Sequence, residues 1–553
     1  MIIRLRKPEN PFHYLGKLTN YKLSIKSAAV ILAVSTLLAA ILGLLRDRIL
    51  NSMYLSTYPT GIDAYTAAFM IPDFMYFVLV SGALNVTFIP VLNEHLVKKH
   101  KKSAWELSSS IINLLAIVTL VVSVLIIIFA APLVKYVISP GLSESGQALA
   151  VSMMRVIAIN PFLFSIATIM TSMQQATGRF IFYALAPAIY NVGIIIGTLF
   201  FTNGITIFGW HIFGGGIMGV ALGVALGSVM QFLVSIIGLF GMGFDYKFKI
   251  KWRDKSFRRV LKLIPARSLD QGTDYVNGIV EVNLSSRMAA GTVRSYQQAL
   301  NFHSMPVNLI GVAISTAFFP KMTESVGENR EDKFKNDLRA SLRMIVWLAL
   351  PVAIMVFFTR GYLVSFIKNG GDVLIAGLLG ALVVSIFFRS VFQIVSRGFY
   401  AHQDTRTPFI VSIISIGLSI SLAIYFSMVL HFGPYGLAYG QSIGAVVEVS
   451  ILVFILNHRL NGIFSPALVR AFLKIFVAAI IAGIVTYIAT LIWPLRATDQ
   501  SIFVTFPKFV LICLFGGLAY IAAGLTLHLK ENADVIQHTI KLLSKTIRHG
   551  KHS

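Results

Sequence analysis

Charged residues are scarce in this sequence, and acidic ones are the scarcest. Only 13% of the 553 residues are Asp, Glu, Lys or Arg, whereas 56% are hydrophobic. A soluble protein of this size needs far more polar surface to cover its core, so a soluble globular fold is excluded. The single cysteine, Cys513, excludes a disulfide framework and a cysteine-ligated metal site.

Sequence motifs of nucleotide binding and hydrolysis are also missing. The chain has no P-loop, no H-E-x-x-H and no G-x-S-x-G, which argues against ATP-driven transport by this chain itself and against hydrolase chemistry. Its histidines fall mainly in loops and near the end of the chain, where a solvated side chain is favoured over a metal ligand. We therefore predict a transporter and not an enzyme, with no catalytic residue, metal site or resident cofactor.

Long apolar runs recur along the whole chain. An α-helix needs roughly 20 apolar residues to cross a hydrocarbon core of about 30 Å, and such runs predict an all-α polytopic membrane protein with about 14 transmembrane helices. Clear examples are Ala28–Leu45, Leu114–Val134, Phe409–Val429 and Phe509–Leu527.

The formal net charge of +24 lies mostly in alternate loops. This pattern is explained by the excess of Lys and Arg in cytoplasmic loops, so nucleic acid is not expected as a partner. The rule places both termini in the cytoplasm, as expected for a protein of a cytoplasmic (inner) membrane. The basic segments are residues 4–26, 98–102, 247–259, 321–335 and the stretch from 530; the intervening loops 139–146, 202–214 and 431–434 have no Lys or Arg.

The apolar runs suggest a division into two lobes. No cleavable signal peptide is evident, so we interpret the first run as a retained anchor. The mixed apolar and basic stretch from Asn532 predicts a helix lying on the anionic inner leaflet. The expected segments are a basic leader at 1–26, spans 1–6 at 27–245, spans 7–12 at 246–460, spans 13–14 at 461–529 and a basic amphipathic tail at 530–553.

A glycine pattern occurs once in each lobe. Gly219, Gly223 and Gly227 are spaced four apart, and Gly436, Gly440 and Gly444 repeat that spacing. Glycines four apart share one helix face and let a second helix approach closely. We interpret the recurrence as an internal duplication of six spans, which predicts a pseudo-two-fold axis along the membrane normal. Chance similarity of apolar helices is the alternative.

The seventh span contains ionisable groups that are costly inside a membrane and usually face a cavity or a partner. One interpretation is a water-filled vestibule that binds an anionic head group. The alternative is internal ion pairing, for example of Arg267 with Asp270 or Asp274. The charged positions are Arg267, Asp270, Asp274, Glu281 and Arg287, followed by Arg294 at the start of the eighth span.

Several short motifs resemble, in their order, the MurJ (MviN) lipid II flippases of the multidrug/oligosaccharidyl-lipid/polysaccharide exporter superfamily. Matching features run from about residue 30 to 460, and the ordered series is more specific than any single motif. The motifs are Ile41–Asp47, Asp63-Ala64, the stretch from Pro72 through Gly82-Ala83 to Pro90, Gly178–Phe180 with Ala186-Pro187, and Gly398–Tyr400 leading into Gln403–Pro408.

This resemblance implies a V-shaped bundle around a cationic cavity. It also implies flipping of the undecaprenyl-diphosphate-linked peptidoglycan precursor, lipid II, to the outer leaflet by alternating access. Arg46 would be a cavity arginine and Asp63 an acidic residue near the outer mouth. The partners implied are lipid II or a related polyprenyl-diphosphate glycolipid, membrane lipids and cell-wall synthesis enzymes.

The sequence also departs from the family pattern. Three positions at which the family usually has arginine have other residues here. They fall at Ala40, around Tyr76-Phe77 and at Asn301. We hypothesise that Arg287 and Arg294 supply the missing charge. The candidate substrate-binding residues are Arg46, Asp63, Arg287, Arg294 and Asn301; Asp270, Asp274, Glu281 and Asp404 are candidates for coupling to an ion, with Na⁺ as the ion considered.

Other functions are consistent with the same sequence. A flippase for another lipid-linked oligosaccharide would keep the fold and the mechanism. A cation-coupled drug antiporter of the same superfamily should instead have a cavity dominated by carboxylates and aromatic rings. A non-transporting pseudo-transporter scaffold is favoured by the lost arginines at Ala40 and Asn301 and opposed by the remaining charges within the spans.

Overall fold

The computed structural model describes residues 25–98, 100–207, 210–496 and 498–532. Side chains of residues 25–29, 81–87, 205–207, 210–213 and 263–274 are not described. The predicted basic leader and amphipathic tail therefore lie almost wholly outside the described residues. The chain divides into two compact units, residues 1–294 and 295–553. The internal duplication with a lobe boundary at 245/246 stays a prediction.

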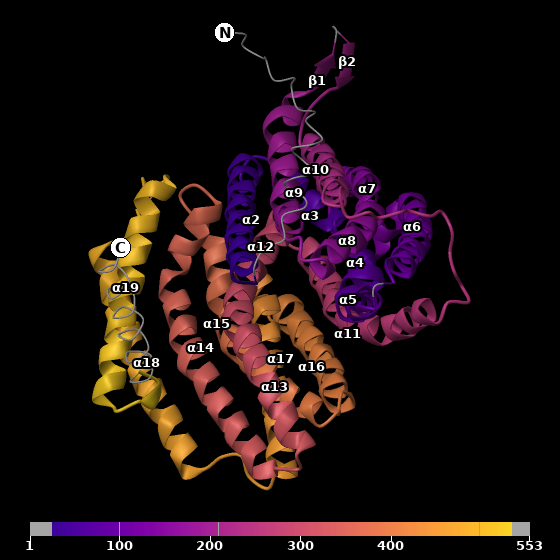
Figure 1. The fold of residues 1–553 in the computed structure, drawn as a ribbon. Helices are drawn as coiled ribbons and strands as arrows, with labels where there is room; N and C mark the ends of the chain where they lie inside the picture. Colours follow the sequence, from indigo (N-terminus) through magenta and orange to yellow (C-terminus); the bar gives the residue numbers. More distant parts are fainter. Residues whose placement is uncertain (1–24, 99, 208–209, 497, 533–553) are drawn as a thin grey trace, which may run out of the picture. The chain divides into compact units, whose positions relative to one another are not determined.

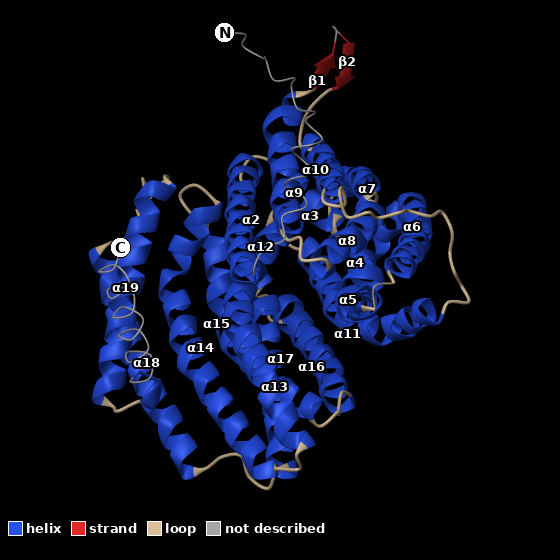
Figure 2. Ribbon diagram, viewed as in Figure 1, coloured by secondary structure: helices blue, strands red, loops and turns tan. Residues whose placement is uncertain are grey.

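The first unit is helical apart from one short antiparallel hairpin within the described residues (Figures 1 and 2). Its elements are α2 (Ile25–Tyr54), α3 (Pro59–Ala68), α4 (Met70–Tyr76), α5 (Gly82–Val97), α6 (Lys101–Pro132), α7 (Glu144–Ile157), α8 (Asn160–Ala176), α9 (Ile181–Phe200), β1 (Ile205–Ile207), β2 (Trp210–Phe213), α10 (Met218–Ile237), α11 (Lys255–Ser286) and the start of α12 (Thr292–Pro306).

The second unit contains helices alone in its described part (Figure 2). After the remainder of α12 come α13 (Ala313–Gly327), α14 (Glu331–Ile367), α15 (Val373–Ala401), α16 (Arg406–Ile424), α17 (Pro434–Arg459), α18 (Pro466–Ile492) and α19 (Ile502–Thr526).

The expected polytopic membrane architecture is confirmed. Among the described residues, thirteen helices are long and apolar enough to cross a membrane. The further helix is α11, the predicted seventh span, whose 32 residues include Arg267, Asp270, Asp274 and Glu281. With α11 the helices occur in the expected order and number about 14, and the chain is a multi-pass membrane protein.

Two proline positions coincide with a change in helix type. α6 ends at Pro132 and continues as a π-helical segment over Leu133–Ile138, and α12 ends at Pro306 and continues over Val307–Val312 in the same way. Proline has no N–H group and its ring crowds the preceding turn, so it disturbs the α-helical hydrogen bonding. The wider π-helical turns keep the chain helical after each of these two prolines. Pro351, by contrast, lies inside α14, which stays α-helical.

Both predicted glycine series pack against the preceding helix in their own unit. In the first unit α10 lies along α9, and a Cβ added to Gly193 would lie 2.2 Å from the Cα of Gly227. In the second unit α17 lies along α16, where a Cβ added to Gly440 would lie 2.7 Å from the backbone N of Ala423. The close approach predicted from the spacing is confirmed in both places, since no larger residue fits without moving a backbone.

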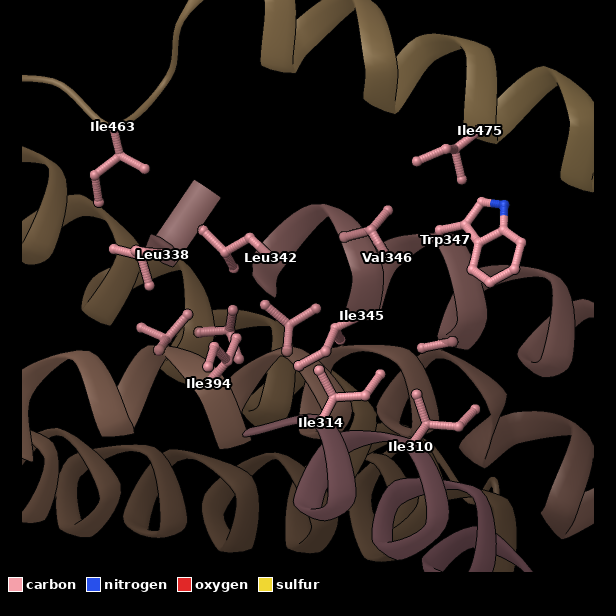
Figure 3. Close-up of a cluster of buried hydrophobic side chains, with 14 of the residues drawn as sticks. Ile310, Ile314, Leu338, Leu342, Ile345, Val346, Trp347, Ile394, Ile463 and Ile475 are labelled. Carbon is pink, nitrogen blue, oxygen red and sulfur yellow. The ribbon is translucent and has the colours of Figure 1, made fainter. Parts of the chain in front are cut away.

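The apolar core of the second unit is organised by α14. Leu338, Leu342 and Ile345 recur at helical spacing, so they share one face. That face meets Ile394 of α15, while Ile475 of α18 belongs to the same cluster (Figure 3). Because lipid tails are as apolar as these side chains, the contact is stabilised mainly by close van der Waals packing and not by transfer from water.

We expect the glycine contact between α9 and α10 to be sensitive to side-chain volume. Gly227→Val should lower the thermal stability in detergent, because overpacking typically costs about 1–3 kcal/mol and the neighbouring atoms here are backbone. The control is Gly417→Val in α16, where a Cβ would meet nothing within 4 Å. Equal melting temperatures for the two variants would contradict the predicted packing role.

Candidate functional site

A cluster of polar side chains begins near the C-terminal end of α2, in the first unit. Asp47 and Asn51 are four residues apart, so they lie on one face of the helix. Both are buried, with 7% and 0% of their surface exposed. Buried polar groups at this depth need partners within the protein, because the hydrocarbon region offers no water to hydrogen-bond them.

Arg46 precedes this pair and is held at three of its nitrogens. Its Nε and one terminal nitrogen donate to Asp47 Oδ1 at 3.1 and 3.0 Å, and the other terminal nitrogen donates to Asn191 Oδ1 at 3.0 Å. Asn191 lies in α9 and also donates to the carbonyl of Ala39 at 3.3 Å. The interaction therefore ties α2 to α9 and fixes the orientation of the Arg46 side chain.

Arg294, near the start of α12, binds the same carboxylate although it lies 247 residues after Asp47 in the sequence. It donates to Asp47 Oδ1 at 3.0 Å through a terminal nitrogen and to Asn51 Oδ1 at 2.8 Å through Nε. Its side chain is 7% exposed, whereas that of Arg46 is 24% exposed. One carboxylate therefore holds two guanidinium groups, one buried and one partly open.

Asp63 in α3 supports this arrangement through the backbone of α12. Its Oδ1 accepts the N–H of Arg294 at 2.8 Å and its Oδ2 accepts the N–H of Gly291 at 2.6 Å. A helix N-terminus has unpaired N–H groups and a positive partial charge, so a carboxylate there is doubly favourable. Asp63 is 1% exposed and acts as the cap of α12, although it comes from a distant part of the chain.

Gly291 separates the two arginines expected to act together. Its φ of 90° lies in the left-handed region, which glycine adopts at little cost and which ends helical continuity between α11 and α12. Arg287 is exposed and its Nε donates to Asn283 Oδ1 at 3.2 Å, within α11. Of the two proposed replacements for the missing family arginines, Arg294 hydrogen-bonds to Asp47 as Arg46 does, whereas Arg287 hydrogen-bonds to Asn283 instead.

The other candidates in and around α11 are placed as follows. Glu281 is 8% exposed and accepts a hydrogen bond from Asn277 Nδ2 at 3.0 Å. Asn301 is exposed on α12 and accepts from Gln297 Nε2 at 3.4 Å. The side chains of Asp270 and Asp274, like that of Arg267, lie outside the described residues, so their suggested ion pairing stays a prediction.

Asp404, between α15 and α16, is held firmly. Its Oδ1 accepts the N–H groups of Arg406 and Thr407 at 3.0 Å each, and its Oδ2 accepts from Arg459 at 2.5 Å. Burial opposes ionisation here, but the hydrogen bonds from Thr407 and the Arg459 guanidinium outweigh it and hold the pKa of Asp404 well below its usual range. The carboxylate joins the start of α16 to the end of α17.

A second buried ion pair lies entirely within the second unit and was missed from the sequence. Glu448 of α17 accepts from Arg389 of α15 at 3.1 Å and from Ser412 of α16 at 2.6 Å. The signal was available, since Glu448 is an acidic residue inside an apolar run. Asn51 and Asn191 were also missed, because a neutral amide in an apolar helix has no charge to distinguish it. Each accepts a hydrogen bond from an arginine of the cluster.

Comparison with known proteins places the fold among membrane transporters. A solved structure described as a lipid II flippase MurJ in an inward closed conformation has a TM-score of 0.71 and 24% identity, covering 92% of this chain and 100% of that one. An inward-facing multidrug resistance MATE family transporter of the MOP superfamily has a TM-score of 0.62 at 16% identity, covering 79% and 98%. At these identities the similarity shows the fold.

Sequence comparison gives the family. A probable lipid II flippase MurJ of Borreliella burgdorferi is 24% identical over 408 residues, covering 72% of this chain and 77% of the relative. A lipid II flippase MurJ of Burkholderia cenocepacia is 27% identical over 412 residues, covering 72% and 78%. The family model described as lipid II flippase MurJ matches residues 57–506. Because that match extends over most of the sequence, the chain belongs to the lipid II flippase MurJ family.

Proposed function

We propose that this chain flips lipid II from the inner to the outer leaflet of the bacterial cytoplasmic membrane by alternating access. The observation that supports this most directly is the pair of guanidinium groups, Arg46 and Arg294, held by the single carboxylate of Asp47. A diphosphate is a dense anionic group, and arginine binds phosphate oxygens through a planar fork of N–H donors that stays charged.

Arg46 is the group through which the diphosphate would first be bound. A guanidinium has five N–H donors, and the hydrogen bonds of Arg46 use three of them, which leaves two without an acceptor among the described residues. Its side chain is also the more exposed of the pair, at 24% against 7%. Arg294, the more buried arginine, would add positive electrostatic potential at the bound diphosphate, because charges interact strongly in a region of low dielectric.

Asp47 would position both arginines before the substrate arrives. A buried ion pair contributes little net stability, because desolvation of both charges offsets much of their attraction. It does fix geometry, and a prepositioned donor loses less side-chain entropy when a ligand binds. The diphosphate would cross the membrane with its sugar head group shielded from lipid, while the polyprenyl tail stays among the acyl chains.

The remaining parts of the proposal rest on sequence. We infer that both termini are cytoplasmic, because the basic loops alternate with loops that have few or no Lys and Arg, Lys368 and Arg496 being exceptions. Transport would be driven by the membrane potential, worth about 2.3 kcal/mol per charge and 100 mV, or by Na⁺. Recruitment of cell-wall synthesis enzymes by the basic loops stays a prediction, as does coupling to Na⁺.

The arginine pair also bears on the alternative functions. A site for cationic drugs would be expected to present carboxylates, whereas in this cluster Asp47 and Asp63 are already occupied by Arg46, Arg294 and backbone N–H groups. A flippase for another polyprenyl-diphosphate glycolipid would use the same two arginines. A scaffold without transport would not need them, so their replacement separates these possibilities.

We expect Arg46→Ala and Arg294→Ala each to lower lipid II binding by at least tenfold, because a charge-assisted bond to phosphate contributes about 1.5–3 kcal/mol. Native mass spectrometry of the purified protein would measure the binding, and a reconstituted flipping assay the transport. The control is Arg155→Ala, since Arg155 is exposed on α7 and donates to the carbonyl of Ile127 at 3.3 Å, outside the cluster. Normal flipping by both variants would refute the proposed site.

Asp63 should behave as a structural residue of this site. Asp63→Ala removes both acceptors for the first N–H groups of α12 and should lower the free energy of unfolding by about 1–2 kcal/mol. Asp63→Asn keeps one acceptor oxygen, so its free energy of unfolding should lie between those of the wild type and Asp63→Ala. Among folded molecules the affinity for lipid II should change less than threefold. Loss of lipid II binding at an unchanged melting temperature would instead indicate direct contact with substrate.

Asp404 should stabilise the fold and not respond to Na⁺. Because its folded-state pKa is depressed, its contribution is fully present above the ordinary pKa of aspartate and is lost only as pH falls through the depressed value. Asp404→Asn should therefore lower the melting temperature by the same amount at pH 6 and pH 8, in Na⁺ and in K⁺. A Na⁺-dependent transport defect without a change in melting would support ion coupling.

A further inference from the structure

A cavity of about 440 Å³ lies in the second unit, and its lining shares no residue with the arginine cluster of the first. Its walls come from α13, α14, the start of α18 and the segment that follows α19. Phe318, Trp347 and Leu468 supply an apolar surface, and Arg339, Arg343 and Lys530 supply positive charge. The cavity is within the usual range for small-molecule sites, which is roughly 300–1,000 Å³.

The position of the cavity along its helices corresponds to the head-group region of a membrane. The uncharged part of α14 begins at Met344, one residue after Arg343, and that of α18 begins at Ile475, one residue after Lys474. α19 ends at Thr526, just before Lys530. Three apolar segments therefore begin or end around the cavity. Trp347 in its wall is a residue type enriched at membrane–water interfaces.

The two arginines of the cavity are held in place by hydrogen bonds. Arg339 donates from Nε to the carbonyl of Ile463 at 2.6 Å and from a terminal nitrogen to that of Gly462 at 3.1 Å. Arg343 donates to Glu531 Oε2 at 2.9 Å. Glu531 is the one carboxylate among the lining residues, against three cations, so the lining has a formal charge of +2.

The segment after α19 is itself anchored in this wall. Asn532 accepts a hydrogen bond from Trp347 Nε1 at 2.7 Å and donates to the carbonyl of Ile521 at 2.9 Å. Leu529 is 2% exposed. The backbone that carries Lys530 and Glu531 is therefore fixed relative to α14, and these two charges belong to a defined site.

We propose that this cavity binds the phosphate head group of an anionic glycerophospholipid. The phosphate would lie between Arg343 and Lys530, and the glycerol and upper acyl chain would follow Phe318, Trp347 and Leu468. Basic pockets between transmembrane helices are the kind of site that binds anionic head groups. A zwitterionic lipid fits less well, because its ammonium group would face the same cations. This inference is independent of the proposed flipping function.

The test uses the full chain in detergent, titrated with phosphatidylglycerol or phosphatidylethanolamine and observed by native mass spectrometry. The wild type should bind phosphatidylglycerol with clear preference. The double variant Arg343→Gln/Lys530→Gln should lower that affinity about tenfold or more, because each cation near anionic lipid contributes about fivefold. Lys474→Gln is the matched charge control, since Lys474 is exposed on α18 and does not line the cavity.

A second variant separates the site from general charge attraction and from misfolding. Ala340→Phe adds volume at an exposed lining position and leaves every charge in place. It should reduce phosphatidylglycerol binding while the melting temperature stays that of the wild type. Equal losses for Lys474→Gln and the double variant, or undiminished binding by Ala340→Phe and the double variant, would overturn the proposal.

Lipid II is included as a competitor because it carries the same phosphate chemistry. The proposal expects lipid II to leave the phosphatidylglycerol bound in this cavity, and Arg343→Gln/Lys530→Gln to bind lipid II as the wild type does. Displacement of phosphatidylglycerol by lipid II that is abolished in the double variant would assign the cavity to the transported substrate and overturn its assignment to a phospholipid. Neither result depends on whether Arg46 and Arg294 bind lipid II.

Discussion

A polar group within the hydrocarbon region must find its partner inside the protein, and this constraint governs the charged residues of the chain. Water is absent there, so an unpaired donor or acceptor costs several kcal/mol. Asp47 meets the requirement with two arginines, Asp63 with the first N–H groups of α12, and Glu448 with Arg389 and Ser412. Each carboxylate joins elements that are distant in the sequence.

The lipid surroundings also explain why the helices approach so closely at their glycines. Without a hydrophobic driving force between helices in lipid, stability comes from close contact, and small residues allow it. The pairs α9–α10 and α16–α17 use glycine faces at positions that the spacing in the sequence indicated. Around α14 the larger side chains Leu338, Leu342 and Ile345 fill the space instead. Rigid packing of this kind gives the polar clusters a fixed frame.

The arginine cluster shows how a membrane protein keeps charge available for a ligand. If every donor of Arg46 were satisfied internally, the side chain would only hold the fold together. Three donors are used and its side chain is 24% exposed, so it is both oriented and accessible. Arg294 is the more deeply buried partner. This division of roles is consistent with recognition of a diphosphate, for which position and charge matter more than flexibility.

Much of the architecture was determined by the sequence alone, because hydropathy and helical spacing are local properties. Apolar runs predicted the spanning helices, glycines spaced four apart predicted the close contacts, and Arg46 was a candidate from its motif. Only the tertiary structure decided that Asp47 joins Arg46 to Arg294, 247 residues away, and that Gly291 leaves Arg287 outside the cluster. Such pairings depend on which helices pack together and on the turns between them, and neither follows from the periodicity of one helix.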